Sequence, residues 1–286
     1  MRVAGRKRFQ WVLPRGRLVL GERTLVMGVL NVTPDSFSDG GRYLSPQAAV
    51  KQALAMQRAG ADLLDIGGES TRPGSEGVSA EEELRRILPV LRGLRRRINI
   101  PVSVDTNKVE VAEAAIEAGA QIINDITGLR AEPEIAGVVK RAKAGLILMH
   151  IRGRPRTMQK KQFARNVWRM LERDLGRSVE AALSRGVRRA QLVLDPGIGF
   201  GKSTAQNCEI IKHLRRLEKF RLPVLIGTSR KTFIGKILDD SPPAERLWGT
   251  AASVTAAILG GAHIVRVHDV EEMRQVVRIS DAILRS

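Results

Sequence analysis

The sequence predicts an α/β protein with a single (β/α)8 TIM-barrel domain. Short apolar runs recur eight times along the 286 residues, helix-like stretches separate them, and polar or charged residues lie within or just beyond the runs. This alternation is typical of a (β/α)8 barrel, whose active site lies at the C-terminal ends of the strands. The runs are Leu25–Leu30, Leu63–Ile66, Pro101–Val104, Ile122–Ile123, Leu146–Met149, Leu192–Leu194, Pro223–Ile226 and His263–Val267.

A basic N-terminal segment, residues 1–24, precedes the predicted barrel, residues 25–286. Phe9–Leu13 and Leu18–Leu20 read as two strands around a Pro- and Gly-containing turn, which predicts a β-hairpin that caps the bottom of the barrel. Six Lys or Arg residues before the first acidic residue leave a cleavable transit peptide as the alternative. The turn chemistry favours the hairpin.

Helical spacing and capping residues predict the segments between the strands. Ser79, followed by Glu81, Glu82 and Glu83, is typical of a helix N-terminus. The long loops 32–44 and 67–78 are rich in Gly, Ser, Pro and Asp, and we expect them to act as lids. The expected helices are Pro46–Ala59, Ser79–Arg97, Lys108–Ala118, Glu132–Ala142, Ala164–Ser184, Thr204–Leu217, Ala244–Leu259 and Val270–Leu284.

Composition restricts the class of protein. No apolar stretch approaches the roughly 18 residues that cross a bilayer, so no membrane partner is expected. A single cysteine, Cys208, excludes an internal disulfide and fits a reducing cytoplasm. The hydrophobic content of 43% is sufficient for a large core.

The net charge of +18 is unevenly distributed. Residues 141–189 hold fourteen Lys or Arg against three acids. One interpretation is a surface for nucleic acid or another polyanion. With ten aromatic residues and no recognisable nucleic-acid-binding motif, a solvated helix face is favoured and nucleic acid is not expected as a partner. The stripe comprises Arg165, Arg169, Arg173 and Arg177, spaced four apart on one expected helix.

Eight sequence blocks occur in one order from about Leu25 to the end of the chain. Together they resemble dihydropteroate synthases, and eight ordered blocks are far more specific than any one alone. The blocks are Met27–Gly41 (MGVLNVTPDSFSDGG), Asp65–Gly74 (DIGGESTRPG), Ser103–Thr106, Ile123–Asp125, Leu148–His150, Asp195–Lys202 (DPGIGFGK), Gly227–Lys231 (GTSRK) and Arg266–Asp269.

The resemblance implies a transferase of folate biosynthesis. Such enzymes join (7,8-dihydropterin-6-yl)methyl diphosphate to 4-aminobenzoate, forming a C–N bond and releasing diphosphate and 7,8-dihydropteroate. It also implies a Mg²⁺ cofactor, a cytoplasmic homodimer, and competition by sulfonamides as aminobenzoate analogues. The family's fold is the barrel that the alternation predicts.

Four strand-end residues match the family's pterin-binding set: Asp105, Asn124, Asp195 and Lys231. Carboxylates suit the N–H donors of the guanidine-like pterin edge, whereas an amide and an ammonium suit its remaining acceptors. The alternative is that each residue only caps a strand, but four at equivalent depth favour a site. By resemblance Met149 forms an apolar wall of this pocket.

The resemblance assigns the diphosphate to Arg266 and His268, with Val267 between them and Thr71 and Arg72 facing them from the second loop. Arg266 and His268 alternate on the last strand and therefore point to one side. Arg266 is also expected to lay its planar guanidinium against the pterin, which Lys could not do.

Asn31 matches the family's Mg²⁺ ligand. A hard ion that keeps several waters and bridges phosphate oxygens needs little from the protein, so one amide oxygen can suffice. Asp35 is expected to orient the ion or to stabilise positive charge on the pterin methylene. Together with Lys231, Arg266 and His268, these two residues form the predicted catalytic set.

The first two loops are expected to close over 4-aminobenzoate. Phe37, Pro73 and Phe200 would form its apolar walls, and Lys231 and Thr232 would lie near its carboxylate. The expected mechanism is dissociative: diphosphate leaves, a cationic pterin methylene forms, and the aromatic amine attacks it. Such catalysis needs positioning and electrostatic stabilisation without a side-chain nucleophile.

Three other functions are less consistent with the sequence. The run Gly197–Lys202 superficially resembles a phosphate-binding loop, but the GxxxxGK[ST] spacing fails because residue 196 is proline. A pterin-binding methyltransferase barrel would have no use for the diphosphate residues or the Ser229–Lys231 loop. A non-catalytic polyanion-binding barrel predicts a degraded site, whereas these residues are intact.

Overall fold

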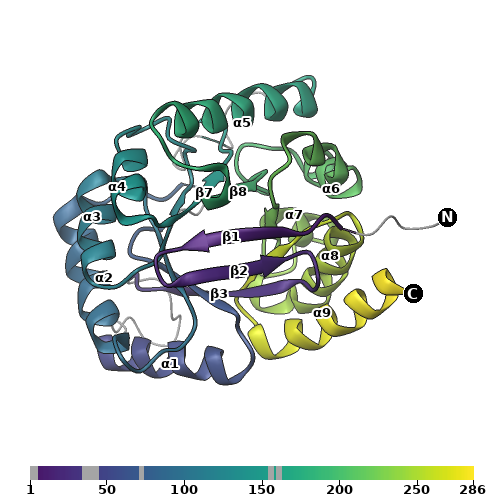
Figure 1. Cartoon of the computed structure of the whole chain (residues 1–286). Helices are drawn as coiled ribbons and strands as arrows, with labels where there is room; N and C mark the ends of the chain where they lie inside the picture. The colour runs from purple at the N-terminus through teal and green to yellow at the C-terminus, as the bar shows by residue number, and fades with distance from the viewer. Residues whose placement is uncertain (1–5, 34–44, 71–73, 154–157, 159–162) are drawn as a thin grey trace.

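The computed structural model describes residues 6–33, 45–70, 74–153, 158 and 163–286 of the chain. Eight parallel strands form one sheet that curves into a barrel, which confirms the predicted fold class (Figure 1). The barrel strands are β3 (Leu25–Asn31), β4 (Leu63–Gly67), β5 (Val102–Asp105), β6 (Ile122–Asp125), β7 (Gly145–Met149), β8 (Leu192–Asp195), β9 (Leu225–Ile226) and β10 (Ile264–Val267).

Each barrel strand pairs with its neighbour in sequence, except that β8 and β9 form no ladder, and β10 pairs with β3 to join the end of the chain to its beginning. Between β8 and β9 a backbone hydrogen bond and one isolated bridge close the barrel. The N–H of Leu194 donates to the carbonyl of Pro223 at 2.9 Å, and Leu194 bridges to Val224 in the parallel sense. Because the strands are parallel, their C-terminal ends lie together at one end of the barrel, which we call the mouth.

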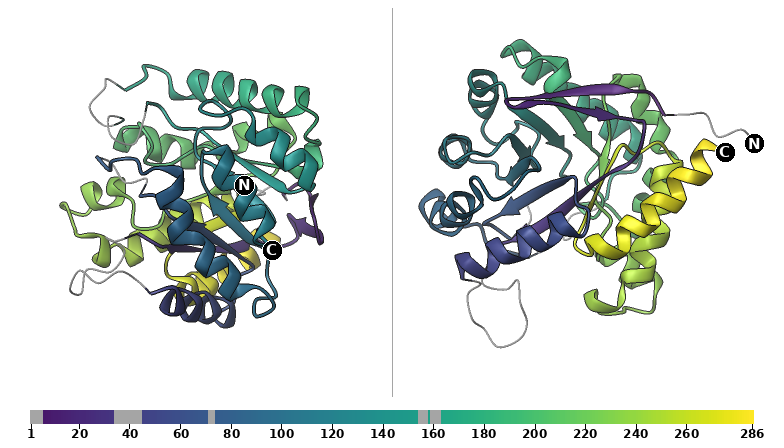
Figure 2. Two further views of the ribbon diagram at one scale, coloured as in Figure 1. Left: turned by 90° about the vertical axis from the view of Figure 1, so that its left-hand side faces the viewer. Right: turned by 60° about the horizontal axis from the view of Figure 1, so that its bottom comes forward.

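Helices cover the outside of the barrel (Figures 1 and 2). Ser45, Ser79 and Ser203 begin three of them, each with its hydroxyl accepting a backbone N–H of the first turn, as N-caps do. The helices are α1 (Pro46–Arg58), α2 (Ala80–Leu94), α3 (Val109–Glu117), α4 (Ile135–Ala142), α5 (Val167–Ser184), α6 (Thr204–Lys212), α7 (Thr232–Ile237), α8 (Leu247–Leu259) and α9 (Val270–Arg285).

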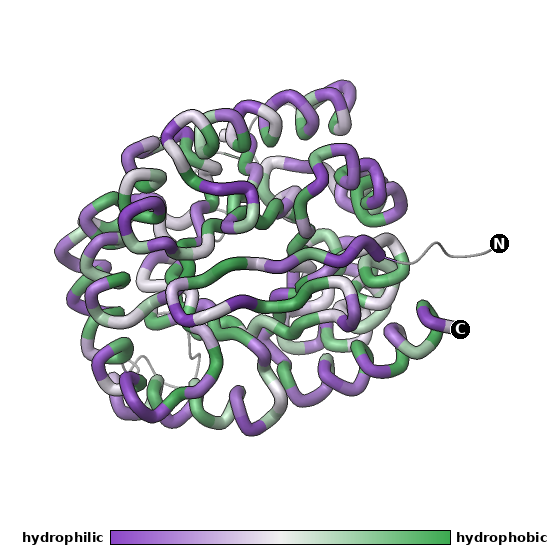
Figure 3. The backbone as a smooth tube through the Cα atoms, viewed as in Figure 1, coloured by the Kyte–Doolittle hydropathy of each residue, from purple (hydrophilic) through white to green (hydrophobic). Residues whose placement is uncertain are grey.

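The main core fills the layer between the helices and the outer face of the sheet. The barrel strands are therefore apolar along most of their length, whereas the helices alternate between apolar and polar residues (Figure 3). Within the described residues, no helix is long and apolar enough to span a membrane.

Several helices differ from the sequence prediction, and α2, α4 and α5 are each shorter at one end by about one turn. The expected helix Thr204–Leu217 ends at Lys212, and Leu214–Phe220 continues as a 3-10 helix. The helix expected from Ala244 begins at Leu247, after a 3-10 turn. A 3-10 helix has 3.0 residues per turn and an α-helix has 3.6. Over one or two turns this difference is too small for the spacing of apolar residues to distinguish the two helix types. The six-residue helix α7 is too short for periodicity to reveal, and it was not predicted.

The N-terminal hairpin consists of β1 (Phe9–Leu13) and β2 (Gly16–Leu20), which pair antiparallel as predicted. It crosses the end of the barrel opposite the mouth (Figure 2). Trp11 is 1% exposed, and its indole N–H donates to the carbonyl of Gln191 at 2.8 Å. Gly145 leaves room for this ring, because a Cβ there would lie 2.9 Å from it. The hairpin therefore closes the bottom of the barrel.

Candidate active site

One charged network joins four barrel strands at the mouth. Arg266, on β10, donates from Nε to Oδ2 of Asp65 at 2.6 Å and from Nη2 to Oδ2 of Asp105 at 3.0 Å. Asn124, on β6, donates from Nδ2 to the same Asp65 oxygen at 3.0 Å. Burial raises the pKa of Asp105, and the guanidinium of Arg266 opposes that rise. The buried carboxylates raise the pKa of Arg266, so its positive charge is secure.

The network leaves acceptors unused. Oδ1 of Asn124 and Oδ1 of Asp65 are buried and accept no hydrogen bond from the described part of the chain. A buried polar atom without a partner costs about 1–3 kcal/mol, so such atoms are rare in folded proteins and often face a ligand. Since Asp65 engages the NH2 group of Asn124, it leaves the amide oxygen of Asn124 free for a hydrogen-bond donor on a bound molecule.

A carboxylate and an ammonium lie beside this network. Asp195 ends β8, is 4% exposed, and accepts the N–H of Gly197 through Oδ1 at 2.7 Å. Burial raises the pKa of Asp195 to about 6, with the Gly197 N–H and the charge of Lys231 opposing the rise. Burial, followed by the charge of Arg266, lowers the pKa of Lys231 to about 8. The carboxylate of Asp195 and the ammonium of Lys231 thus lie near each other in a buried environment.

An apolar wall accompanies these charges. Phe200 packs in a separate apolar cluster at the mouth, and Nζ of Lys231 lies 3.9 Å from the centroid of its ring. A cation over an aromatic face is attracted by the ring quadrupole. The cluster consists of Ile126, Met149, Ile151, Met158 and Phe200. A flat molecule with an apolar face and polar edges fits this combination.

The loop between β9 and α7, which carries Lys231, is tightly held. Arg230 has a left-handed backbone (φ 58°), and its guanidinium forms two hydrogen bonds with the carboxylate of Asp269, one of them from Nε at 3.0 Å. Arg246 donates to the carbonyl of Arg230 at 3.0 Å, and the backbone N–H of Arg230 donates to Oγ1 of Thr250 at 3.1 Å. These contacts from α8 and the end of β10 determine where Lys231, the N-cap of α7, lies.

Ser229 in the same loop orients His268. The backbone N–H of His268 donates to Oγ of Ser229 at 3.2 Å, and that hydroxyl lies 2.9 Å from Nδ1 of the ring. A hydroxyl that accepts the N–H can donate to Nδ1, which assigns the ring proton to Nε2. Burial, followed by the charge of Arg266, lowers the pKa of His268 to about 3. The ring is therefore a neutral N–H donor near pH 7.

The structure brings most of the predicted pterin residues together, and the contacts of the others are informative. The side chain of Val267 is fully buried in the outer core, so only its backbone can face the mouth. Thr232 is the exposed first residue of α7. The predicted residues Asp35, Phe37, Thr71, Arg72 and Pro73 lie outside the described residues.

The sequence assigned no substrate contact to Asp65, Ser229, Asp269 or Lys202. Asp65 lies within β4 among apolar residues. A carboxylate inside a buried apolar strand was the one sequence feature that could have indicated its role. The other three belong to recognised blocks, but their partners lie far away in sequence. Asp125, in contrast, accepts from Thr127 and Leu129 and holds its own loop.

Asn31 is the candidate ligand for a divalent ion. It ends β3 at the mouth, is half-buried, and its Oδ1 lies 3.6 Å from the position a Cβ on Gly67 would take. Among the described residues, no group of three His, Cys, Asp or Glu side chains could hold a metal ion. A Mg²⁺ ion that takes most of its ligands from water and phosphate fits this single amide oxygen.

Comparison with known proteins gives one consistent result. Residues 27–268 match the family described as pterin binding enzymes. A dihydropteroate synthase from Synechocystis sp. is 49% identical over 275 residues, covering 96% of this chain and 95% of that protein.

Two solved structures agree with this match. A dihydropteroate synthase from Xanthomonas albilineans with 4-aminobenzoic acid has a TM-score of 0.88 and 41% identity, covering 97% of this chain and 99% of that one. A dihydropteroate synthase from Burkholderia cenocepacia complexed with 7,8-dihydropteroate has a TM-score of 0.86 and 37% identity, covering 96% of each chain.

Proposed function

Since the chain belongs to the dihydropteroate synthase family of pterin-binding enzymes, we infer that it joins (7,8-dihydropterin-6-yl)methyl diphosphate to 4-aminobenzoate. The products are 7,8-dihydropteroate, a folate precursor, and diphosphate. The observation that carries this function is the network of Arg266, Asp65, Asp105 and Asn124 beside Asp195 and Lys231. It offers carboxylates, an amide oxygen and cations to one flat heterocycle.

The pterin ring is held by its edges. Asp195 and Asn124 accept from the N–H groups of the guanidine-like edge, and Asp105 accepts from a further ring N–H. Lys231 donates to the acceptors on the other side of the ring. Arg266 lies between the carboxylates with its plane fixed by two hydrogen bonds, which allows it to stack on the pterin face. Met149 supplies an apolar contact from the wall.

The diphosphate lies toward β10 and the first two loops. His268 donates from Nε2 to a phosphate oxygen, a role supported by its neutral ring and its contact with Ser229. Arg266, Thr71 and Arg72 add positive charge and donors, and the backbone of Val267 adjoins them. Asn31 would hold Mg²⁺, which when bound neutralises charge on the departing diphosphate.

The 4-aminobenzoate lies against Phe200, with Phe37 and Pro73 of the first two loops as its other walls. Lys231 and Thr232 meet its carboxylate at the start of α7. The position of Lys231 over the Phe200 ring supports this assignment, because one residue pair then contacts both the ring and the charge of the substrate. Sulfonamides compete for the same place as aminobenzoate analogues.

The reaction proceeds by dissociative displacement. The bond between the pterin methylene and its diphosphate oxygen breaks first, with His268 and Arg266 stabilising the leaving oxygens. The electron-rich pterin shares the positive charge of the methylene, which Asp35 also stabilises. The amine of 4-aminobenzoate then attacks this carbon and loses a proton. The residues act by position and charge, and no covalent enzyme intermediate forms.

The enzyme acts in the cytoplasm as a homodimer. The exposed free thiol of Cys208 supports a reducing compartment. Trp248 is 79% exposed at the start of α8, close to the exposed apolar residues Ile237 and Leu238 at the end of α7. Large apolar side chains gathered on a surface are typical of a contact between subunits.

Amine-dependent diphosphate release tests the function. The purified protein is incubated with the dihydropterin diphosphate and Mg²⁺, with and without 4-aminobenzoate, and diphosphate and dihydropteroate are measured. Equal release of both products, only with the amine, is expected. Release without the amine would indicate a hydrolase, and binding without any release would favour a pterin-binding protein. Chelation of Mg²⁺ should abolish release and its readdition restore it.

A further inference from the structure

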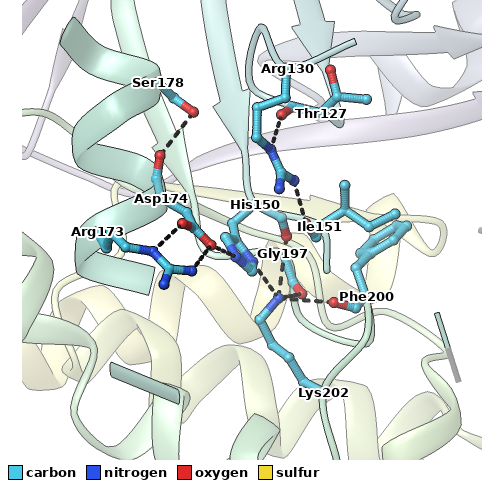
Figure 4. Close-up of polar contacts among 10 residues, drawn as sticks. All are labelled: Thr127, Arg130, His150, Ile151, Arg173, Asp174, Ser178, Gly197, Phe200 and Lys202. Atoms are coloured by element: carbon cyan, nitrogen blue, oxygen red, sulfur yellow. Dashed lines mark hydrogen bonds and ion pairs between the residues drawn. The ribbon is translucent and has the colours of Figure 1, made fainter. Parts of the chain in front are cut away.

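Lys202 is a buried cation that the reaction does not use. It ends the glycine-rich turn after β8 and is 2% exposed. Its ammonium contacts Nδ1 of His150 at 3.0 Å and three carbonyl oxygens: Gly197 at 2.8 Å, Phe200 at 3.1 Å and His150 at 3.2 Å (Figure 4). Burying an ammonium is costly unless acceptors surround it, and here acceptors from two loops do so.

A chain of polar contacts continues from Lys202 to the surface of α5. Nε2 of His150 lies 3.3 Å from Oδ2 of Asp174, and Arg173 donates to both oxygens of that carboxylate at 2.8 and 3.2 Å (Figure 4). Burial, followed by the charge of Lys202, lowers the pKa of His150 to about 3. The ring is therefore neutral, accepting from Lys202 at Nδ1 and donating to Asp174 from Nε2.

The turn that Lys202 holds has little freedom. Gly197 and Gly201 have left-handed backbones (φ 66° and 68°), and Cβ atoms there would lie 1.9 Å from the carbonyl oxygen of His150 and 2.4 Å from that of Arg152. The backbone of the turn therefore packs directly on the chain that follows β7. This close packing brings carbonyl groups together, and the ammonium of Lys202 offsets their mutual repulsion.

The turn carries Phe200. Its N–H donates to the carbonyl of Gly197 at 3.2 Å, and its own carbonyl accepts from Lys202 and from the N–H of Arg152 at 3.4 Å. The Phe200 ring carries the ammonium of Lys231 3.9 Å from its centroid. Whatever holds the backbone at this point consequently sets the position of the Phe200 ring.

We propose that Lys202 is a positioning residue for 4-aminobenzoate, acting through the Phe200 turn, and that His150 and Asp174 orient its ammonium. The proposal rests on the function given above and adds a residue to it. Lys202 touches neither substrate. Its loss releases the face of Phe200 on the aminobenzoate side, whereas the pterin residues Asp105 and Asn124 lie at strand ends and are held by Arg266 and Asp65.

The test compares Lys202→Met with wild type and with Lys212→Met, the same change at an exposed site on α6. Initial rates are measured while each substrate is varied at saturating levels of the other. In Lys202→Met the KM for 4-aminobenzoate is expected to rise about tenfold or more, the scale of a lost charged hydrogen bond. The KM for the pterin diphosphate should stay within about twofold, and Lys212→Met should match wild type.

A second variant covers the case in which Lys202→Met does not fold. Asp174→Asn, at a half-buried position outside the proposed substrate contacts, removes the charge that orients His150. It should raise the KM for 4-aminobenzoate by a smaller factor, and the KM for the pterin diphosphate should again stay unchanged. Equal changes in both KM values, or a lower melting temperature with neither KM changed, would overturn the proposal.

Binding separates this proposal from the function itself. Calorimetric titration of 4-aminobenzoate into protein saturated with diphosphate and a hydroxymethyl dihydropterin requires no turnover. If wild type makes no dihydropteroate, the proposed function fails. Weaker aminobenzoate binding by Lys202→Met than by wild type would still support the positioning role, and equal binding would refute it.

Discussion

Among single residues, Asp65 organises the mouth. One of its oxygens accepts from both Arg266 and Asn124, so it sets the plane of the guanidinium and the orientation of the amide together. A lysine at position 266 could not make these two fixed hydrogen bonds to Asp65 and Asp105. A residue that contacts no substrate edge can in this way determine how two others meet the pterin.

Replacing Asp195 with Asn should weaken pterin binding. We expect the carboxylate to accept pterin N–H groups, and a hydrogen bond to a charged partner contributes about 1.5–3 kcal/mol, equivalent to roughly 10- to 100-fold in Kd. Calorimetry with the pterin diphosphate measures the change. Asp239→Asn, at an exposed position after α7, is the matched control and should bind as wild type does. Unchanged affinity in Asp195→Asn would remove Asp195 from the site.

The dependence of kcat/KM on pH should be bell-shaped. Burial raises the pKa of Asp195 to about 6 and lowers that of Lys231 to about 8. Below about pH 6 Asp195 gains a proton and stops accepting, and above about pH 8 Lys231 loses its charge, so the rate should fall on both sides. Asp195→Asn should lose the acidic limb. If the variant kept the same fall in rate below about pH 6, that fall would instead reflect protonation of the diphosphate.

Among the elements, the hairpin β1–β2 stabilises the barrel from the end opposite the chemistry. Its Trp11 and Leu13 pack on Gly145 at the start of β7, and Leu20 joins the apolar residues inside the barrel. His263 adds a polar attachment, accepting the N–H of Val224 at 3.1 Å and contacting the carbonyl of Lys7 at 3.1 Å. The hairpin is therefore attached to the barrel both by apolar packing and by hydrogen bonds.

Trp11→Ala should therefore lower the free energy of unfolding by about 3–5 kcal/mol, the usual cost of removing a buried large aromatic side chain. Denaturant unfolding followed by far-UV circular dichroism measures it. Val19→Ala, on the exposed side of β2, should change stability by no more than about 0.5 kcal/mol. A loss below 1 kcal/mol in Trp11→Ala would mean that the hairpin is only loosely attached.

At the scale of the whole molecule, the basic charge and the apolar surface lie on different elements. Along α5, Arg173 pairs with Asp174, while Glu172 of the same helix pairs with Arg216 and Lys219. These contacts give part of the basic region a structural use. Most of the large exposed apolar residues in the described part of the chain lie instead on or just after α7, at the start of α8 and on α9, including Ile279 and Ile283.

If two copies associate through this apolar surface, Trp248→Asp should separate them. A desolvated charge in the centre of an interface costs several kcal/mol, so the dimer Kd should rise by at least a hundredfold. Sedimentation velocity over a range of protein concentrations measures the effect, with Arg177→Asp on α5 as a control that stays dimeric. A wild-type protein that sediments as a monomer at high concentration would exclude the homodimer.

The sequence alone determined the barrel, its bottom hairpin and the identity of most residues at the mouth. Strand–helix alternation is a local property of the chain, and a parallel barrel brings every strand end to one mouth, so Asp105, Asn124, Asp195 and Arg266 could be assigned to one site. Long-range pairing was not predictable in this way. The contacts of Arg266 with Asp65 span 201 positions, and those of Lys202 with His150 span 52.

Only the tertiary structure decided how these residues meet. It showed that Asp65 holds both Arg266 and Asn124, that Ser229 orients His268, and that Lys202 holds the Phe200 turn. It also showed the short helix α7 and the early end of α6. The physical reason is that apolar spacing records which face of an element is buried, whereas hydrogen bonds between distant loops depend on where the closed barrel places their backbones.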